Sequence, residues 1–227
     1  MLVLITGGAR SGKSGFAEAY AAELSDTGYY IATSQALDEE MEERIALHRT
    51  KRELDQSIFW HTVEEPVALA DALQTLDRGV KATGPQVVLV DCLTLWLTNV
   101  LLSEEEPEWD KAARHRAAQR AEEAIHGLIE SLLKIRHHHV LLVTNEVGSG
   151  IVPEYPLGRL YRDLAGIMNR RLAAVCQEVY LVTAGIPVEL KRLQKELAAG
   201  GTKLAGETAQ EHPGPELPSS SQEKGRR

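Results

Sequence analysis

The sequence of 227 residues has little of what marks several other classes of protein. Its only two cysteines, Cys92 and Cys176, have no CxxC or zinc-ligand spacing, so we expect two buried, reduced thiols. No apolar run approaches the roughly 20 residues of a membrane-spanning helix. Basic residues are in the minority, with a formal net charge of −8, which argues against a general nucleic-acid binder.

The beginning and the composition of the chain suggest where it works. The first apolar run starts at Leu2, which leaves no room for a cleavable signal peptide, so we expect a cytoplasmic protein with no membrane span. The length suits one α/β domain, and we place its boundary near residue 194. Residues 195–227 include several glycines and prolines and the run Ser219–Ser221, which predicts a disordered tail.

Short apolar runs alternate with helical patterns along residues 1–194. The expected strands lie at residues 2–5, 29–32, 58–62, 87–90, 140–143 and 179–182. The expected helices lie at residues 13–24, 38–52, 66–76, 94–102, 110–136 and 157–176, and His137–His139 is taken as a loop. Strands that are apolar throughout and alternate with helices predict a mostly parallel sheet covered on both faces. Ligands of such sheets bind beyond the carboxyl ends of the strands.

A glycine-rich turn between the first strand and the first helix matches the phosphate-binding pattern GxxxxGK[ST]. It comprises Gly7, Gly8, Ala9, Arg10, Ser11, Gly12, Lys13 and Ser14. Glycines allow the backbone amides of such a turn to point at one phosphate chain, and the following helix adds its positive end. Lys13 is expected to reach the β- and γ-phosphates and the Ser14 hydroxyl to bind Mg²⁺. This pattern predicts a P-loop NTPase fold of the RecA-like type.

Other polar residues follow the remaining apolar runs. Asp91 ends the strand at residues 87–90, where P-loop proteins carry a second metal-associated carboxylate. The alternative is that Asp91 only caps the next helix. Thr33, Ser34 and Glu64 follow two other strands, so the same edge of the sheet should gather all four residues.

One helix carries a histidine among cations. Arg44, His48 and Arg52 are spaced four residues apart and therefore share one helical face. Neighbouring cations disfavour the protonated imidazole, and a neutral imidazole is a potential nucleophile. A solvated surface histidine fits the same pattern, and the residues alone favour that simpler interpretation.

The assembled motifs resemble one family, the bifunctional adenosylcobinamide kinase / adenosylcobinamide-phosphate guanylyltransferases of cobalamin biosynthesis. The resemblance extends over about residues 1–191. It is carried by TGGARSGKS from Thr6, YIATSQALDEEM from Tyr30, RIALHR from Arg44, LVDCLTLWLTN from Leu89, LVTNEVGSGIVP from Leu142, RLYRDLAGIMNRRLA from Arg159 and EVYLVTAGIPVELK from Glu178. The P-loop is shared by many enzymes, whereas ATSQ, RIxxH and NEVGxGxVP together are far more specific.

The resemblance implies two reactions and a set of residues. It implies phosphorylation of adenosylcobinamide with ATP or GTP, followed by transfer of GMP from GTP through a guanylylated histidine, which would be His48. It also implies Mg²⁺ as cofactor and a homotrimer. Further nucleotide contacts carried over by position are Thr33, Ser34, Arg49, Thr50, Lys51, Arg52, Glu64 and Asp91. A P-loop small-molecule kinase without transferase activity and a nucleotide-dependent regulatory protein remain the alternatives.

Overall fold

The computed structural model describes residues 1–35, 43, 50, 57–79, 86–104, 106 and 108–204. Within these residues the chain forms a seven-stranded sheet in the order β3-β2-β4-β5-β1-β6-β7. The strands are β1 (Leu2–Gly7), β2 (Thr27–Ala32), β3 (Phe59–Glu64), β4 (Gln86–Asp91), β5 (His138–Val143), β6 (Glu178–Thr183) and β7 (Ile186–Glu189). All neighbouring strands are parallel except β6 and β7. The predicted P-loop α/β fold with a mostly parallel sheet is confirmed.

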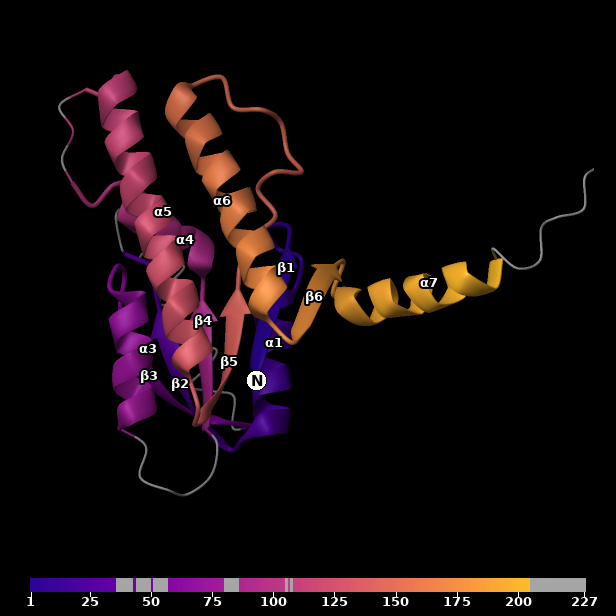
Figure 1. Ribbon diagram of the computed structural model, residues 1–227. Helices are drawn as coiled ribbons and strands as arrows, with labels where there is room; N and C mark the ends of the chain where they lie inside the picture. The colour runs from indigo at the N-terminus through magenta and orange to yellow at the C-terminus, as the bar shows by residue number, and fades with distance from the viewer. Residues whose placement is uncertain are drawn as a thin grey trace, which may run out of the picture. The chain divides into compact units, whose positions relative to one another are not determined.

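Helices lie against both faces of the sheet (Figure 1). On one face are α3 (Leu69–Arg78), α4 (Leu93–Leu101), α5 (Lys111–Lys134) and α6 (Pro156–Val175). The other face packs against α1 (Lys13–Leu24) through Ala17 and Ala21. The alternating side chains of the central strands serve the two layers: Leu2 and Leu4 of β1 face the α3–α6 layer, and Val3 and Ile5 face the α1 layer. Both layers are apolar because the central strands are buried on each side.

The sheet order determines which loops meet. Strand β5 lies between β1 and β4, so the loop after β5 emerges between the P-loop and Asp91. Strand β2 pairs with both β3 and β4, with Ala32 opposite Glu64 on one side and opposite Asp91 on the other. The carboxyl ends of parallel strands share one edge, so the P-loop, Glu64 and Asp91 emerge together there.

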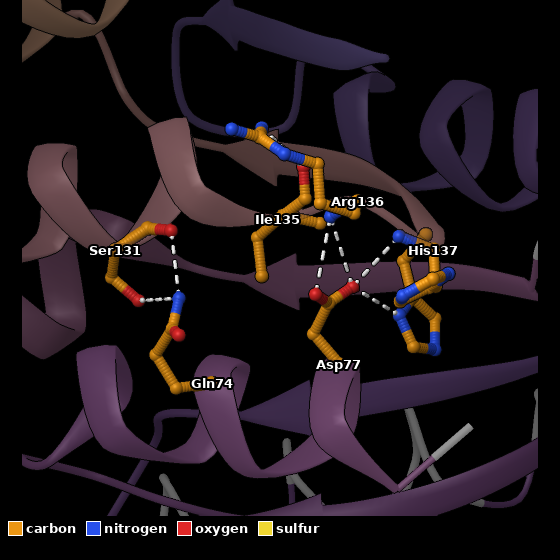
Figure 2. A network of polar contacts seen from close by, with 7 residues as sticks. Gln74, Asp77, Ser131, Ile135, Arg136 and His137 are labelled. Carbon is orange, nitrogen blue, oxygen red and sulfur yellow. Dashed lines mark hydrogen bonds and ion pairs between the residues drawn. The ribbon is translucent and has the colours of Figure 1, made fainter.

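The prediction that His137–His139 forms a loop is wrong for its last two residues. His138 is the first residue of β5 and is buried, and its ring nitrogen Nδ1 lies 3.2 Å from the Asp77 carboxylate at the end of α3. The same carboxylate accepts hydrogen bonds from the backbone amides of Arg136 and His137 (Figure 2). A histidine is unusual at a buried strand position, because its polar ring nitrogens need hydrogen-bond partners, and here the Asp77 carboxylate of α3 provides one of them. Asp77 therefore lies beside the amino-terminal end of β5, at the end of the sheet opposite the P-loop.

Two further differences concern the ends of helices, and a third is an additional strand. Helix α3 begins at Leu69 rather than Pro66, because the Glu65 carboxylate accepts from the amides of Val67 and Ala68 and holds a turn before the helix. Strand β7 was not predicted. Helix α7 (Leu190–Leu204) continues past residue 194, so the first part of the expected disordered tail is helical. The helix expected at residues 38–52 lies outside the described residues, apart from Glu43 and Thr50, which are helical and exposed.

The chain divides into two compact units, Met1–Lys191 and Arg192–Arg227. The first unit contains the whole sheet and both apolar layers. Cys92 and Cys176 are buried free thiols, as the sequence predicted. No helix among the described residues is long and apolar enough to cross a membrane.

Candidate functional site

The P-loop joins β1 to α1 in a compact turn. The amide of Ser11 donates to the carbonyl of Gly8 at 3.3 Å, and Arg10 and Gly12 adopt positive φ angles of 57° and 94°. Gly12 provides the left-handed conformation before the first residue of α1, which a residue with a side chain rarely adopts. The free amides at the start of α1 and the positive end of its dipole therefore face the turn. Such an arrangement favours the binding of an anion.

The turn between β6 and β7 presses against the P-loop. Ala184 and Gly185 form a two-residue hairpin turn with φ angles of 52° and 79°, and the amide of Gly185 donates to the carbonyl of Ser11 at 2.8 Å. A Cβ atom on Gly12 would lie 3.2 Å from the Gly185 Cα, and one on Gly7 would lie 2.4 Å from the Val182 carbonyl oxygen. Both glycines are therefore required by close backbone packing. The sequence analysis did not predict this turn, since Ala-Gly is not among the dipeptides that typically mark a two-residue hairpin.

Two side chains of the P-loop are placed for phosphate. Lys13 is 9% exposed, and its Nζ lies 3.1 Å from the Gly8 carbonyl, so the ammonium group folds back over the loop. An ammonium group held over such a turn can bind the β- and γ-phosphates of a nucleotide. The Ser11 Oγ is buried and has no hydrogen-bond partner among the described residues. An unpaired buried hydroxyl beside a ring of amides fits a phosphate oxygen as its partner.

Asp91 lies at the end of β4 with its carboxylate held by a tyrosine. The Tyr30 hydroxyl donates to Asp91 Oδ2 at 3.1 Å. Asp91 and Ser14 offer a carboxylate and a hydroxyl oxygen, which are the ligand types that Mg²⁺ prefers, and both side chains are partly exposed. Among the described residues there is no group of three or more His, Cys, Asp or Glu that could enclose a metal. Mg²⁺ characteristically uses one or two protein ligands together with substrate phosphates, so these residues fit it.

Thr33 ties the ends of β2 and β4 together. Its hydroxyl donates to the Cys92 carbonyl at 2.7 Å and accepts from the Cys92 amide at 2.9 Å, and its own carbonyl accepts from the Asn99 side chain at 2.7 Å. Thr33 is fully buried, so its hydroxyl is already committed to the main chain. Ser34 beside it is partly exposed, and Glu64 at the end of β3 is exposed. The structure thus brings Ser34, Glu64, Asp91 and the P-loop to one edge of the sheet.

A belt of hydrogen-bonded polar side chains crosses the same edge beneath the P-loop. Its members come from β1, α4, α6 and the segment after β5, and the sequence analysis assigned none of them a role: Thr6, Thr94, Thr144, Asn145, Glu146 and Asn169. The sequence signal was the polar Asn145-Glu146 pair after a buried strand. Their mutual contacts depend on β5 lying beside β1, which no local pattern reveals.

The cationic helical face predicted around His48 falls outside the residues that the structure describes. His48, Arg49, Lys51 and Arg52 lie outside the described residues, and Thr50 is described only as helical and exposed. The P-loop, Asp91 and their supporting residues are therefore the described portion of the predicted site.

Comparison with known proteins gives the same family over nearly all of the first compact unit. A family model described as cobinamide kinase / cobinamide phosphate guanyltransferase matches residues 3–190. The bifunctional adenosylcobalamin biosynthesis protein CobU of Escherichia coli K12 is 44% identical over 200 residues, covering 84% of this chain and all of that protein. CobP of Pseudomonas aeruginosa, with the same description, is 43% identical over 188 residues, covering 83% of this chain and 96% of that protein. CobU of Salmonella typhimurium is 44% identical over 195 residues, covering 84% of this chain and all of that protein.

The family match spans the P-loop, Asp91 and the polar belt. The extent of the family match, well over half of the chain, and the identity with full-length relatives are sufficient to assign the family. The chain belongs to the cobinamide kinase / cobinamide phosphate guanyltransferase family.

Proposed function

We propose that this protein phosphorylates the free hydroxyl of adenosylcobinamide with ATP or GTP and then transfers GMP from GTP to the new phosphate. The products are adenosylcobinamide-GDP and pyrophosphate. The observation that carries the proposal is the P-loop, whose amides, buried Lys13 and unpaired Ser11 hydroxyl converge at the sheet edge beside Asp91. The family assignment supplies the acceptor.

In the kinase reaction the P-loop residues bind and orient the triphosphate. The acceptor hydroxyl attacks the γ-phosphorus, an O–P bond forms, and the bond to the β-phosphate oxygen breaks. The nucleoside diphosphate leaves, and the hydroxyl proton is released to solvent. Lys13 and the amides at the start of α1 stabilise the negative charge on the phosphate oxygens. Ser14 and Asp91 would hold Mg²⁺, which would supply positive charge to offset the negative charge of the triphosphate.

In the transferase reaction the attack shifts to the α-phosphorus. The His48 imidazole nitrogen forms an N–P bond and pyrophosphate leaves, which gives a covalent GMP adduct. The phosphate oxygen of the phosphorylated acceptor then displaces His48 from the same phosphorus. Two displacements replace one difficult transfer. The nucleotide site is proposed to be lined by Thr33, Ser34, Arg49, Thr50, Lys51, Arg52, Glu64 and Asp91. A homotrimer is proposed on the family resemblance alone.

Mass spectrometry after incubation with Mg-GTP tests the proposal directly. We expect one GMP on His48 in the unchanged protein. His48→Ala should carry no GMP but still phosphorylate cobinamide, because its P-loop is intact. Lys13→Ala should lose both activities by about 100-fold or more, which is the scale of a lost charge-stabilising group. His126→Ala, which removes an exposed histidine of α5, is the matched control and should behave like the unchanged protein.

Each alternative gives a different outcome. Cobinamide phosphorylation without any GMP adduct would leave a small-molecule kinase. Nucleotide binding without phosphorylation of cobinamide would indicate a regulatory protein. A normal GMP adduct in His48→Ala would remove His48 from the mechanism.

A further inference from the structure

Glu146 occupies an unusual place for a carboxylate. It follows β5, and its backbone amide donates to the carbonyl of Gly7, the first residue of the P-loop, at 3.1 Å. Its side chain turns back toward β1, where Oε1 accepts a 2.6 Å hydrogen bond from the Thr6 hydroxyl. Glu146 therefore contacts the last two residues of β1 through both its main chain and its side chain.

A buried asparagine of α6 fixes this carboxylate from the other side. Asn169 Nδ2 lies 3.2 Å from Glu146 Oε1 and 3.1 Å from the Asn145 carbonyl, and Asn169 Oδ1 accepts from the Thr144 hydroxyl at 2.8 Å. Asn169 is 8% exposed and Thr144 is fully buried. Asn145 extends the chain of bonds to α4, because its Nδ2 donates to the Thr94 hydroxyl at 2.8 Å. Buried networks in which the donors and acceptors are paired favour one arrangement of the elements that they join.

The P-loop is thus held on two flanks by different means. On the β6 side the contacts are main chain to main chain, from Gly185 to Ser11, with Gly7 tight against Val182. On the β5 side a side chain takes part, and a charged acceptor makes shorter and stronger hydrogen bonds than a neutral one. The β5 flank is therefore the one that a single side-chain substitution can loosen.

We infer that Glu146 is a positioning residue for the nucleotide: its carboxylate, bonded to Thr6 and Asn169, fixes the end of β1 so that the P-loop amides converge on the phosphates. It acts through Thr6 and Gly7. The inference rests on the proposed function only in taking the P-loop ligand to be a nucleoside triphosphate. Because both reactions use the same P-loop, losing this support should raise the KM for nucleotide in both and leave the KM for the corrinoid acceptor unchanged.

The test measures Mg-GTP affinity by calorimetry in a set of variants. Glu146→Ala and Thr6→Val should each weaken GTP binding about tenfold, the loss expected when one hydrogen bond to a charged group is removed. The double variant should bind about as weakly as the worse single variant, because both substitutions break the same bond. Thr6→Ser, which keeps the hydroxyl, and Glu146→Gln, which keeps an acceptor oxygen, should recover most of the affinity.

Glu154→Ala is the matched control. It removes a carboxylate of the same loop that is exposed and makes no side-chain hydrogen bond among the described residues, so GTP affinity should not change. Unchanged affinity in Glu146→Ala, or fully additive losses in the double variant, would overturn the inference. Should Glu146→Ala fail to fold, the comparison of Thr6→Val with Thr6→Ser decides it. GTP binding by a protein that phosphorylates no cobinamide would refute the proposed function and leave this inference standing.

Discussion

At the scale of single residues, the structure distinguishes polar side chains that hold the fold from those that are free to meet a ligand. The Thr33 hydroxyl is of the first kind, because the Cys92 main chain occupies it, and the predicted nucleotide contact of Thr33 stays a prediction. The Ser11 hydroxyl, by contrast, is buried with no partner among the described residues. Asp77 belongs to the first kind, because its carboxylate serves two backbone amides and the His138 ring.

Replacing Asp77 should destabilise the protein in a pH-dependent way. Burial raises the pKa of Asp77, but hydrogen bonds from the His137 amide, the His138 ring and the Arg136 amide outweigh it, so the pKa is lowered overall. A lowered pKa contributes stability above the ordinary pKa of about 3.9, and this contribution is lost as the pH falls through the folded-state pKa. We expect Asp77→Asn to lower the free energy of unfolding by about 2 kcal/mol at pH 7.

Urea denaturation between pH 7 and pH 3 is the measurement for Asp77→Asn. The difference from the unchanged protein should shrink once the pH falls below the ordinary carboxyl pKa of about 3.9, because the unfolded chain then binds a proton that the folded Asp77 carboxylate resists. Asp71→Asn, an exposed position on the same helix, is the control and should have a small effect. A deficit that stays constant down to pH 3 would contradict the assigned cause.

At the scale of elements, the distance between neighbouring backbones explains why glycine occurs within a strand, where its conformational propensity is unfavourable. Gly28 lies in β2 between two paired strands, and a Cβ atom there would approach Val87 Cγ1 to 2.6 Å, Trp60 to 2.8 Å and the Val87 carbonyl to 2.9 Å. Glycine is ordinarily unfavourable in a strand, so its presence marks a close approach. Gly166, in α6, has nothing within 4 Å of the position its Cβ would take.

Alanine at these two glycines should change stability in opposite directions. Gly28→Ala should lower the free energy of unfolding by about 1–3 kcal/mol, because the added methyl group overpacks the junction of three strands. Gly166→Ala should raise it by about 0.5–1 kcal/mol through helix propensity alone. Chemical denaturation of both variants checks the pair, and a stabilised Gly28→Ala would show that the strands adjust freely.

At the scale of the whole molecule, the site depends on strand order more than on any single loop. Strands β2, β4, β5, β1 and β6 bring segments from residues 6 to 185 to one edge, and all of them lie in the compact unit Met1–Lys191. The family match ends at residue 190. The domain boundary near residue 194 stays a prediction, and the helix α7 does not by itself test it.

Shortening the chain tests that boundary. A protein ending at Leu204 should keep its GTP affinity and its thermal unfolding midpoint, because the apolar layers and the described site residues are retained. A protein ending at Val175 should not fold, because it lacks β6, which pairs with β1 and buries Val179 and Val182. If the protein ending at Leu204 bound GTP more weakly than the full chain, the residues after 204 would contribute to nucleotide binding.

The sequence by itself determined the features that depend on neighbouring residues. The P-loop, the apolar strands and the helix after Gly12 were predictable because spacing, glycine conformation and hydrophobic runs act over a few residues. The first turn of α3 was predicted wrongly although its cause, the Glu65 carboxylate, is local. The burial of His138 was also predicted wrongly, because it depends on Asp77 in another element, and the β6–β7 hairpin, whose turn contacts Ser11 of the P-loop, was not predicted.

Only the tertiary structure decided which residues support the P-loop. Glu146, Asn169 and Thr6 are separated by up to 163 residues, and their contact follows from β5 lying between β1 and β4. Strand order is fixed by the packing of two apolar layers over the entire sheet, a property that no local window of sequence contains. The anion-binding turn could therefore be predicted from the sequence, whereas the side chains that position it could be identified only from the tertiary structure.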